Sequence, residues 1–177
     1  METIYLQNTK EVRKEKASLE KALNVKIDVK GKQATISGDP LQEYEASIVL
    51  EAMSFGFSAK KALQLKNENF VFRKLLIKQF TKRKDLHDVR ARLIGTRGKT
   101  KRTMEEISGC KIILHDNTLG ILGPADKIEE ATTALTNLIR GSKQANVYYF
   151  LERVNTKRKQ DKHDAFVSKK DKKNSNL

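Results

Sequence analysis

The sequence predicts an α+β protein made of two similar units, an extra helix and a basic tail. Three observations support this prediction. The sequence that begins at Arg13 is repeated, with changes, from Gly98 onward. Within each repeat, apolar residues follow helical spacing in some segments and form short strand-like runs in others. Basic residues gather in one internal segment and at the C-terminal end, so the positive charge is not dispersed.

The repeat matches residues 13–38 to residues 98–123 without a gap. Identical pairs are Lys14 and Lys99, Lys16 and Lys101, Glu20 and Glu105, Lys26 and Lys111, Ile27 and Ile112, Ile36 and Ile121, and Gly38 and Gly123. The same offset continues through Ala46 and Ala131, Leu50 and Leu135, and Gly56 and Gly141. A fixed period indicates repeated structural units. We therefore expect a first unit at residues 1–69 and a second at residues 70–155.

The second unit begins with a predicted strand at residues 75–80 and a short amphipathic helix at residues 86–94. A Gly-x-x-Gly loop, Gly95 to Gly98, separates this helix from a second helix at residues 99–108. Gly109 is predicted to end the second helix, because glycine readily takes the left-handed conformation found there.

The remainder of the second unit predicts a hairpin and a long helix. Residues 110–114 and 119–122 are short apolar runs separated by Asp116 and Asn117, which is typical of a β-hairpin. Pro124 is expected to open the last helix, which ends near Gly141. The predicted order is strand, helix, loop, helix, strand, strand, helix.

The first unit predicts the same order only from its second helix onward. We expect a helix at residues 10–23, strands at 25–29 and 34–37, and a long helix at 41–55. The unit begins too close to the N-terminus to hold a complete first strand and helix. Its positions that match the glycine loop are Lys10, Glu11, Val12 and Arg13, so both glycines are missing and a carboxylate would face a phosphate.

The charge distribution favours a polyanionic ligand. The net charge of the chain is +14. An excess of positive charge of this size indicates a nucleic-acid ligand first and an acidic membrane second. Residues 82–102 hold nine basic and two acidic residues, and residues 157–177 hold eight basic and three acidic residues. The first segment surrounds the glycine loop, which indicates a binding site there.

The run from Arg92 to Lys99, RLIGTRGK, resembles the signature of KH domains. In these domains such a loop grips about four nucleotides of single-stranded RNA or DNA. The long final helix matches the type I element order. The resemblance implies two tandem type I KH modules, the first of them degenerate. A Gly-x-x-Gly alone is also common in simple turns, but the flanking helices, the repeat and the basic segment favour the KH interpretation.

The expected RNA-binding residues surround this loop. Glycines let the backbone approach a phosphate, and the free N–H groups of the next helix point at it. Neighbouring cations attract the RNA backbone, and an apolar residue supplies a floor for bases. The candidates are Arg90, Arg92, Ile94, Gly95, Thr96, Arg97, Gly98, Lys99, Lys101 and Arg102.

Two further runs, GKTKRTMEEI at residues 98–107 and VYYFLER at residues 147–153, narrow the resemblance. They are similar to the small-subunit ribosome-assembly KH proteins called partner-of-Nob proteins, in their short archaeal form. The resemblance implies a protein without catalysis that binds single-stranded RNA in the 3′ region of small-subunit ribosomal RNA. It also implies two protein partners, the Nob endonuclease and the α subunit of initiation factor two. In many archaeal relatives the first unit keeps its loop glycines. Here both glycines are missing, which puts RNA binding by both units in doubt.

Two other function classes remain open from the sequence: a KH-type regulator of messenger RNA or transcription, and an enzyme. No nucleophile–base pattern or phosphate-binding Gly-rich loop of nucleotide-hydrolysing enzymes is present. The single cysteine, Cys110, excludes an internal disulfide and fits a reducing compartment. Three scattered histidines do not predict a zinc site, and no cofactor is expected. The N-terminus has no apolar run of the signal-peptide type and the chain has no membrane-length apolar run, so we expect a cytoplasmic protein. Because no catalytic motif is present, we expect a protein without catalysis.

The C-terminal region predicts an extra helix at residues 145–155 followed by a tail at residues 156–177. Tyr148, Tyr149 and Phe150 fit core packing or the seam between units, and less well a platform for base stacking. The Lys-rich tail is expected to be disordered or a frayed helical extension. Its two interpretations are a solubilising tail and a nonspecific RNA arm.

Overall fold

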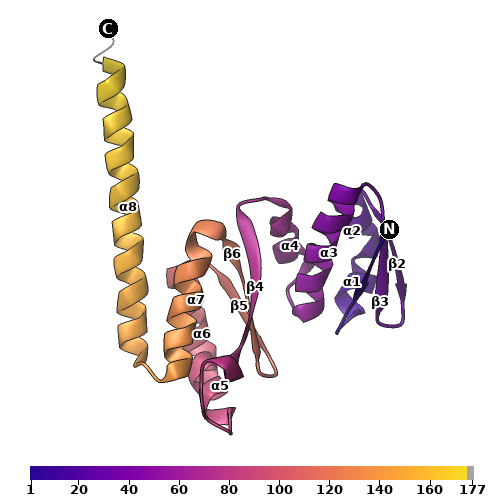
Figure 1. The fold of residues 1–177 in the computed structure, drawn as a ribbon, viewed down its shortest axis with the longest axis horizontal. Helices are drawn as coiled ribbons and strands as arrows, with labels where there is room; N and C mark the ends of the chain where they lie inside the picture. The colour runs from indigo at the N-terminus through magenta and orange to yellow at the C-terminus, as the bar shows by residue number, and fades with distance from the viewer. Residues whose placement is uncertain (175–177) are drawn as a thin grey trace.

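The computed structural model describes residues 1–174, with side-chain surroundings through residue 167. Two three-stranded antiparallel sheets lie in successive layers with helices between and beside them (Figure 1). The order of the layers is the long C-terminal helix α8, then α6 and α7, the second sheet, α3, and the first sheet. No helix among the described residues is long and apolar enough to cross a membrane.

The first unit contains a sheet of strand order β1-β3-β2. Its elements are β1 (Glu2–Tyr5), α1 (Lys10–Lys14), α2 (Lys16–Leu23), β2 (Lys26–Lys30), β3 (Gln33–Ser37) and α3 (Pro40–Phe55), followed by α4 (Ala59–Ala62) and the 3₁₀ helix η1 (Leu63–Lys66). The expectation that the unit cannot hold a complete first strand and helix is corrected for the strand: the short strand β1 is present, although only the short helix α1 stands between it and α2. The strand β1 is too short for a periodic signal, and its pairing with β3 defines it. The helix expected at residues 10–23 is also divided, at Glu15.

The second unit contains a sheet of strand order β4-β6-β5. Its elements are β4 (Phe70–Leu76), η2 (Ile77–Gln79), α5 (His87–Ile94), η3 (Thr96–Gly98), α6 (Lys99–Ser108), β5 (Lys111–His115), β6 (Thr118–Pro124) and α7 (Ala125–Arg140). The predicted element order is confirmed. The first strand was predicted too late, at residues 75–80. The strand starts at Phe70, and both Phe70 and Phe72 pack against the core of the first unit. These residues therefore did not stand out in the sequence as part of a strand of the second unit.

Matched residues of the repeat make matched contacts. Glu20 Oε1 accepts a hydrogen bond from the Ile27 N–H at 2.8 Å, and Glu105 Oε1 accepts one from the Ile112 N–H at 2.8 Å. Each glutamate ties the second helix of its unit to the following strand. The repeat therefore preserves a hydrogen bond as well as a sequence.

A second shared feature is a close approach at the end of the hairpin. A Cβ on Gly38 would lie 3.0 Å from Val25 Cγ1, and a Cβ on Gly123 would lie 2.5 Å from Cys110 Sγ. Glycine at both positions lets the last strand pack against the residue that begins the hairpin. This contact explains why the repeat keeps glycine at residues 38 and 123.

The two units differ in length before their second helix. Glu2 pairs with Ile36, and Arg73 pairs with Ile121, which is the residue that matches Ile36. Sheet register therefore aligns Glu2 with Arg73, whereas the helices that follow align Lys14 with Lys99. The chain between these points is shorter in the first unit. The missing stretch lies at the place where the second unit has α5 and the glycine loop.

The units pack together through aromatic residues at the end of α3. The Phe55 ring lies 5.8 Å from the Phe72 ring, and Phe57 lies 5.6 Å from Phe72. A Cβ on Gly120, in the central strand β6, would lie 2.4 Å from Phe55 Cε1. The second sheet is therefore covered on both faces, by its own helices and by α3.

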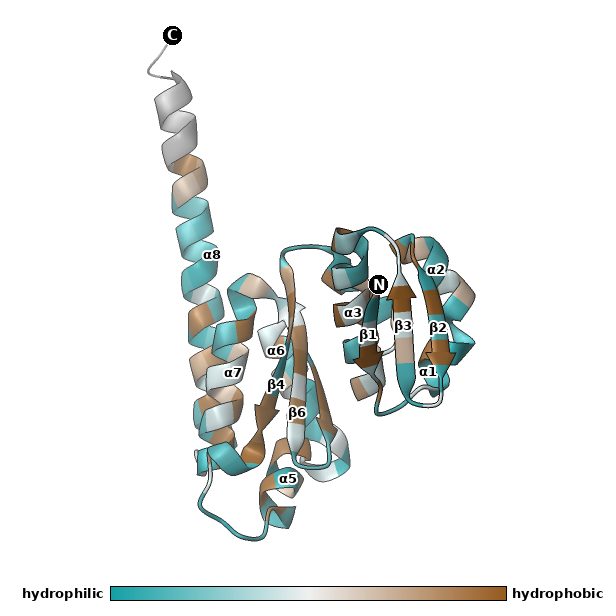
Figure 2. Ribbon diagram, turned by 45° about the vertical axis from the view of Figure 1, so that its right-hand side comes forward, coloured by the Kyte–Doolittle hydropathy of each residue, from teal (hydrophilic) through white to brown (hydrophobic). Residues whose placement is uncertain are grey.

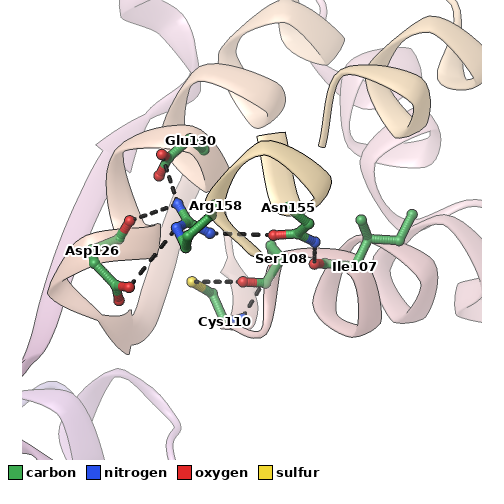
Figure 3. A network of polar contacts seen from close by, with 7 residues as sticks. All are labelled: Ile107, Ser108, Cys110, Asp126, Glu130, Asn155 and Arg158. Carbon is green, nitrogen blue, oxygen red and sulfur yellow. Dashed lines mark hydrogen bonds and ion pairs between the residues drawn. The ribbon is translucent and has the colours of Figure 1, made fainter. Parts of the chain in front are cut away.

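The helix α8 (Gln144–Asn174) covers α6 and α7 on their outer side. Val147 and Leu151 are buried against this layer, and the turns of α8 just beyond α7 are mainly hydrophilic (Figure 2). Arg158 anchors the helix by ion-pairing with Glu130 at 2.7 Å and by donating to the Asp126 carbonyl at 2.8 Å (Figure 3). Asn155 adds a hydrogen bond from its amide to the Ile107 carbonyl, at the end of α6.

The helix corrects the expectation of disorder from residue 156 onward. Residues 156–174 continue α8, which agrees with the alternative of a helical extension. The segment contains neither proline nor glycine and is rich in lysine, which has a good helix propensity. Residues 175–177 lie outside the described part of the chain.

Candidate nucleic-acid interface

The glycine loop forms a tight turn between two helices. Three of its four residues have positive φ: Gly95 at 73°, Arg97 at 52° and Gly98 at 73°. The Gly98 N–H donates to the Gly95 carbonyl at 3.1 Å, which closes the turn. α6 begins directly at Lys99, whose N–H donates to the Thr96 carbonyl within the loop. The N–H groups that follow at the start of α6 have no partner within the helix. Such a helix start favours an anion.

The two glycines are needed for different reasons. A Cβ on Gly95 would lie 2.1 Å from Thr100 Oγ1 and 2.7 Å from the Thr100 backbone nitrogen, so no side chain fits there. A Cβ on Gly98 would meet nothing within 4 Å, and its left-handed backbone alone favours glycine. A side chain therefore has room at residue 98 and none at residue 95.

The start of α8 braces this loop from behind. The Gln144 amide donates to Thr100 Oγ1 at 2.8 Å, and Arg92 Nη2 donates to the Ser142 carbonyl at 2.8 Å. Thr100 is 3% exposed. The loop conformation thus depends on a helix that lies outside the repeated unit.

A groove of about 350 Å³ runs along one side of α5. It is lined by His87, Arg90, Ala91 and Ile94 from α5 and by Leu114 and Asp116 from the β5–β6 hairpin. Ile94 is 40% exposed, which is unusual for a large apolar side chain, and it forms an apolar floor. The groove can accept flat apolar surfaces such as bases, with Arg90 available for phosphate or base edges.

The other predicted side chains are either accessible near the loop tip or engaged with neighbouring groups. Thr96, Arg97 and Lys99 lie around the loop tip and the start of α6 with at least part of their surface accessible. Arg102 is engaged with the loop itself, because its Nη2 donates to the Arg97 carbonyl at 2.7 Å. Lys101 pairs with Glu105 at 3.2 Å, which leaves its charge largely compensated.

A second, larger cavity of about 680 Å³ lies on the adjacent face of α5 and shares Ala91 with the groove. It is lined by Arg92, Gly95, Thr96 and Lys99 of the predicted set, and also by residues that the prediction missed: Arg83, Asp88, Gln144 and Tyr148 among them. The structure thus divides the predicted residues between two hollows that flank the loop.

Some of the missed residues had a sequence signal and others had none. His87 precedes Arg90 and Ile94 by helical spacing on α5, so a helical projection identifies it. Tyr148 was named from the sequence only as a less favoured candidate for base stacking, whereas Leu114, Asp116 and Gln144 reach the site only through the fold. Local sequence around the loop carries no information on them.

Cys110 is excluded as a functional nucleophile. Its side chain is fully buried, and this burial raises the pKa of its thiol to about 11. A thiol of this kind is protonated and unreactive near neutral pH. Among the described residues, no group of three or more His, Cys, Asp or Glu side chains is placed to hold a metal ion.

The matched positions of the first unit form no such site. Residues 10–14 are helical, so no loop replaces the glycine turn. Val12 is fully buried, and Arg13 Nη2 donates to the Gly31 carbonyl at 3.1 Å. Lys10 and Glu11 face solvent, and the carboxylate of Glu11 would repel a phosphate.

Comparison with known proteins identifies the second unit. Residues 71–156 match the model of the eukaryotic type KH-domain (KH-domain type I), in its version for the second such domain of PNO1 proteins. Over 163 residues the chain is 29% identical to a KH domain-containing protein of Methanocaldococcus jannaschii, covering 88% of this chain and 72% of that protein. Over 140 residues it is 31% identical to the RNA-binding protein pno1 of Drosophila pseudoobscura pseudoobscura, covering 75% of this chain but only 59% of that protein.

A solved structure extends the similarity to both sheets. A chain in the crystal structure of the a/eIF2alpha–aDim2p–rRNA complex from Pyrococcus horikoshii superposes on this one with a TM-score of 0.77 at 28% identity. The superposition covers 88% of this chain and 94% of that chain. The mixed α/β fold described above is therefore shared across nearly the whole length of the archaeal structure.

Proposed function

Residues 71–156 form a type I KH domain of the PNO1 family, and from this premise we propose that the protein is an RNA-binding factor in ribosome assembly. In finer detail, it grips single-stranded RNA in the 3′ region of small-subunit ribosomal RNA. The relative in the archaeal complex is accompanied by rRNA, which supports the choice of ribosomal over messenger RNA.

The observation that carries the proposal is the loop between α5 and α6. Its residues of positive φ bring the chain directly into the start of α6, and it adjoins a groove with an apolar floor at Ile94. Backbone phosphate is held at the loop, while bases lie in the groove and are read by their edges. Lys99, Thr96 and Arg97 add charge and a hydroxyl at the point where phosphate arrives.

The first unit acts as a degenerate module with a structural role. It lacks the residues that form α5 and the loop, and its α3 covers a face of the second sheet through Phe55 and Phe57. Without this cover, apolar residues of β4 and β6 would be exposed. The first unit therefore stabilises the platform that carries the RNA site.

Cleavage of the RNA is assigned to a partner. Cys110 is buried and protonated, and the residues around the groove offer binding groups without an activated nucleophile. The Nob endonuclease and the α subunit of initiation factor two, which the family resemblance implies, remain the proposed protein partners. The archaeal complex contains a/eIF2alpha beside aDim2p, which supports the second of them.

The test compares the Gly98→Asp variant with a matched control variant, Gly31→Asp. Both glycines have positive φ and open space around them, so both substitutions add the same charge and similar strain. Affinity for a labelled RNA from the 3′ end of small-subunit rRNA is measured by fluorescence anisotropy. We expect Gly98→Asp to weaken binding at least about tenfold, or about 1.4 kcal/mol, because the carboxylate repels phosphate. Gly31→Asp should bind like the unmodified protein.

Two results would contradict the proposal. Equal affinity of Gly98→Asp and the unmodified protein would exclude the loop. Equal affinity for the rRNA segment and for an RNA of shuffled sequence would exclude the rRNA assignment while leaving RNA binding in place.

A further inference from the structure

We propose that the larger cavity beside the glycine loop is a subsite for one nucleotide that flanks the segment held in the groove. This inference rests on the proposed function, because it needs RNA to cross the loop. Groove and cavity lie on adjacent faces of α5, and Ala91 lines both. Gly95, Thr96 and Lys99 form the edge of the cavity, so an RNA backbone that crosses the loop leaves the groove and enters the cavity.

The cavity wall is built by α8. Tyr148 and Gln144 contribute to it from this added helix, and Arg92 and Thr100 are held there by hydrogen bonds to Ser142 and Gln144. The repeated unit alone would leave this side of the loop open. The start of α8 therefore completes the wall of a second hollow beside the loop.

The charges of the cavity suit a phosphate. Arg83, Arg92 and Lys99 provide three cations, and Asp88 provides one carboxylate. Arg83 lies 4.0 Å from Asp88 with its side chain 59% exposed, so this pair is weak and the guanidinium can turn to a ligand. Lys99 forms no ion pair within the described part of the chain.

The shape and the aromatic wall suit a base. The volume of about 680 Å³ is within the range of roughly 300–1,000 Å³ typical of ligand pockets. Tyr148 is half-buried, packs against the core of the second unit and lines the cavity. A fixed aromatic ring beside a phosphate-binding lysine is the arrangement by which proteins stack single-stranded nucleotides.

The experiment compares two lengths of RNA. The short RNA is the shortest segment whose binding depends on Gly98, and the extended RNAs carry one more nucleotide at the 5′ or the 3′ end. We expect extension at one end to increase affinity about tenfold, near the lower end of what one stacked base contributes. An extension that ends in an abasic nucleotide should give only part of this increase.

Two pairs of variants locate the gain. Tyr148→Ala should lose the increase while binding the short RNA as before, and Tyr149→Ala, at the next and 66% exposed tyrosine, should keep it. Because Tyr148 is half-buried, Arg83→Gln provides a second test at an exposed site. It should reduce the increase, whereas Lys84→Gln, with the same change of charge outside the cavity, should not.

The outcomes separate this inference from the proposed function. The subsite is excluded if extension at neither end increases affinity, or if Tyr148→Ala and Arg83→Gln weaken the short and extended RNAs equally. If no RNA shows binding that depends on Gly98, the proposed function fails first, and the subsite fails with it.

Discussion

The two units of this protein share a scaffold and differ in the segment for which we propose RNA binding. Both keep the glutamate that ties helix to strand, at Glu20 and Glu105, and both keep the glycine that lets the hairpin close. They differ in the stretch between the first strand and the second helix, which is shorter in the first unit. The residues that hold the fold are thus separable from those that grip RNA, and the first unit has one set without the other.

The units also differ in how their sheets are covered. The first sheet alternates buried and exposed residues, so one of its faces is open. The second sheet is covered on both faces, and five consecutive residues of β6 are buried. The seam is buried from both sides, because the second sheet also covers α3 through Leu122 and Phe72, but the outer face of the first sheet has no such cover.

The largest effect on stability is expected from replacing Gly95, one of the two loop glycines that the first unit lacks. Gly95→Ala forces a methyl group against the Thr100 backbone in a left-handed conformation, which should cost about 3 kcal/mol of unfolding free energy. Gly98→Ala meets no neighbour and should cost only about 1 kcal/mol. Urea denaturation of the two variants measures the difference.

Thr100 provides the control for this comparison. If packing against Thr100 causes the loss, then Gly95→Ala combined with Thr100→Gly should recover part of it. Equal stability of the Gly95 and Gly98 variants would show that the loop can move away from α6, and the close approach would then have no energetic weight.

Much of the difference between the two units can be predicted from the sequence. The internal repeat, the order of elements in the second unit and the missing glycines of the first all follow from residue pattern. Helical spacing and turn residues are local signals, so α3, α6, α7 and the two hairpins were placed within a few residues. The candidate residues of the loop follow from the same local signals.

The remainder depends on contacts between distant residues. The strand β1 is defined by pairing with β3, and the start of β4 packs on the other unit, so neither has a strong local signal. The close contact of Gly95 with Thr100 arises from the path of the backbone. Tyr148 and Gln144 join the site only because α8 folds back over α6 and α7. Sequence periodicity identifies a helix but not the neighbour against which it packs.

A smaller effect is expected at the seam between the units, by exchanging matched residues. Gly120 in the second sheet matches Thr35 in the first, whose outer face is open. Gly120→Thr places a side chain against Phe55 and should cost about 2 kcal/mol, because Phe55 must move out of its contact with Phe72. Thr35→Gly should cost at most about 1 kcal/mol, from lost strand propensity alone. Thermal unfolding followed by circular dichroism measures both, and similar losses would mean that the seam contributes little to the second sheet.

The smallest effect is expected from exchanging one charge between the loop and its counterpart. Thr96→Glu gives the second unit the residue that the first has at Glu11, and a carboxylate near phosphate should weaken RNA binding about fivefold, or about 1 kcal/mol at contact distance in water. This penalty should shrink as salt is raised, since the site is exposed. Glu11→Thr removes the same charge from the first unit and should leave affinity within about twofold, because residues 10–14 form a helix without a phosphate-binding turn. Filter binding at low and high salt measures both variants. A gain in affinity from Glu11→Thr as large as the loss from Thr96→Glu would place RNA on the first unit as well, and the separation of scaffold from grip would no longer hold.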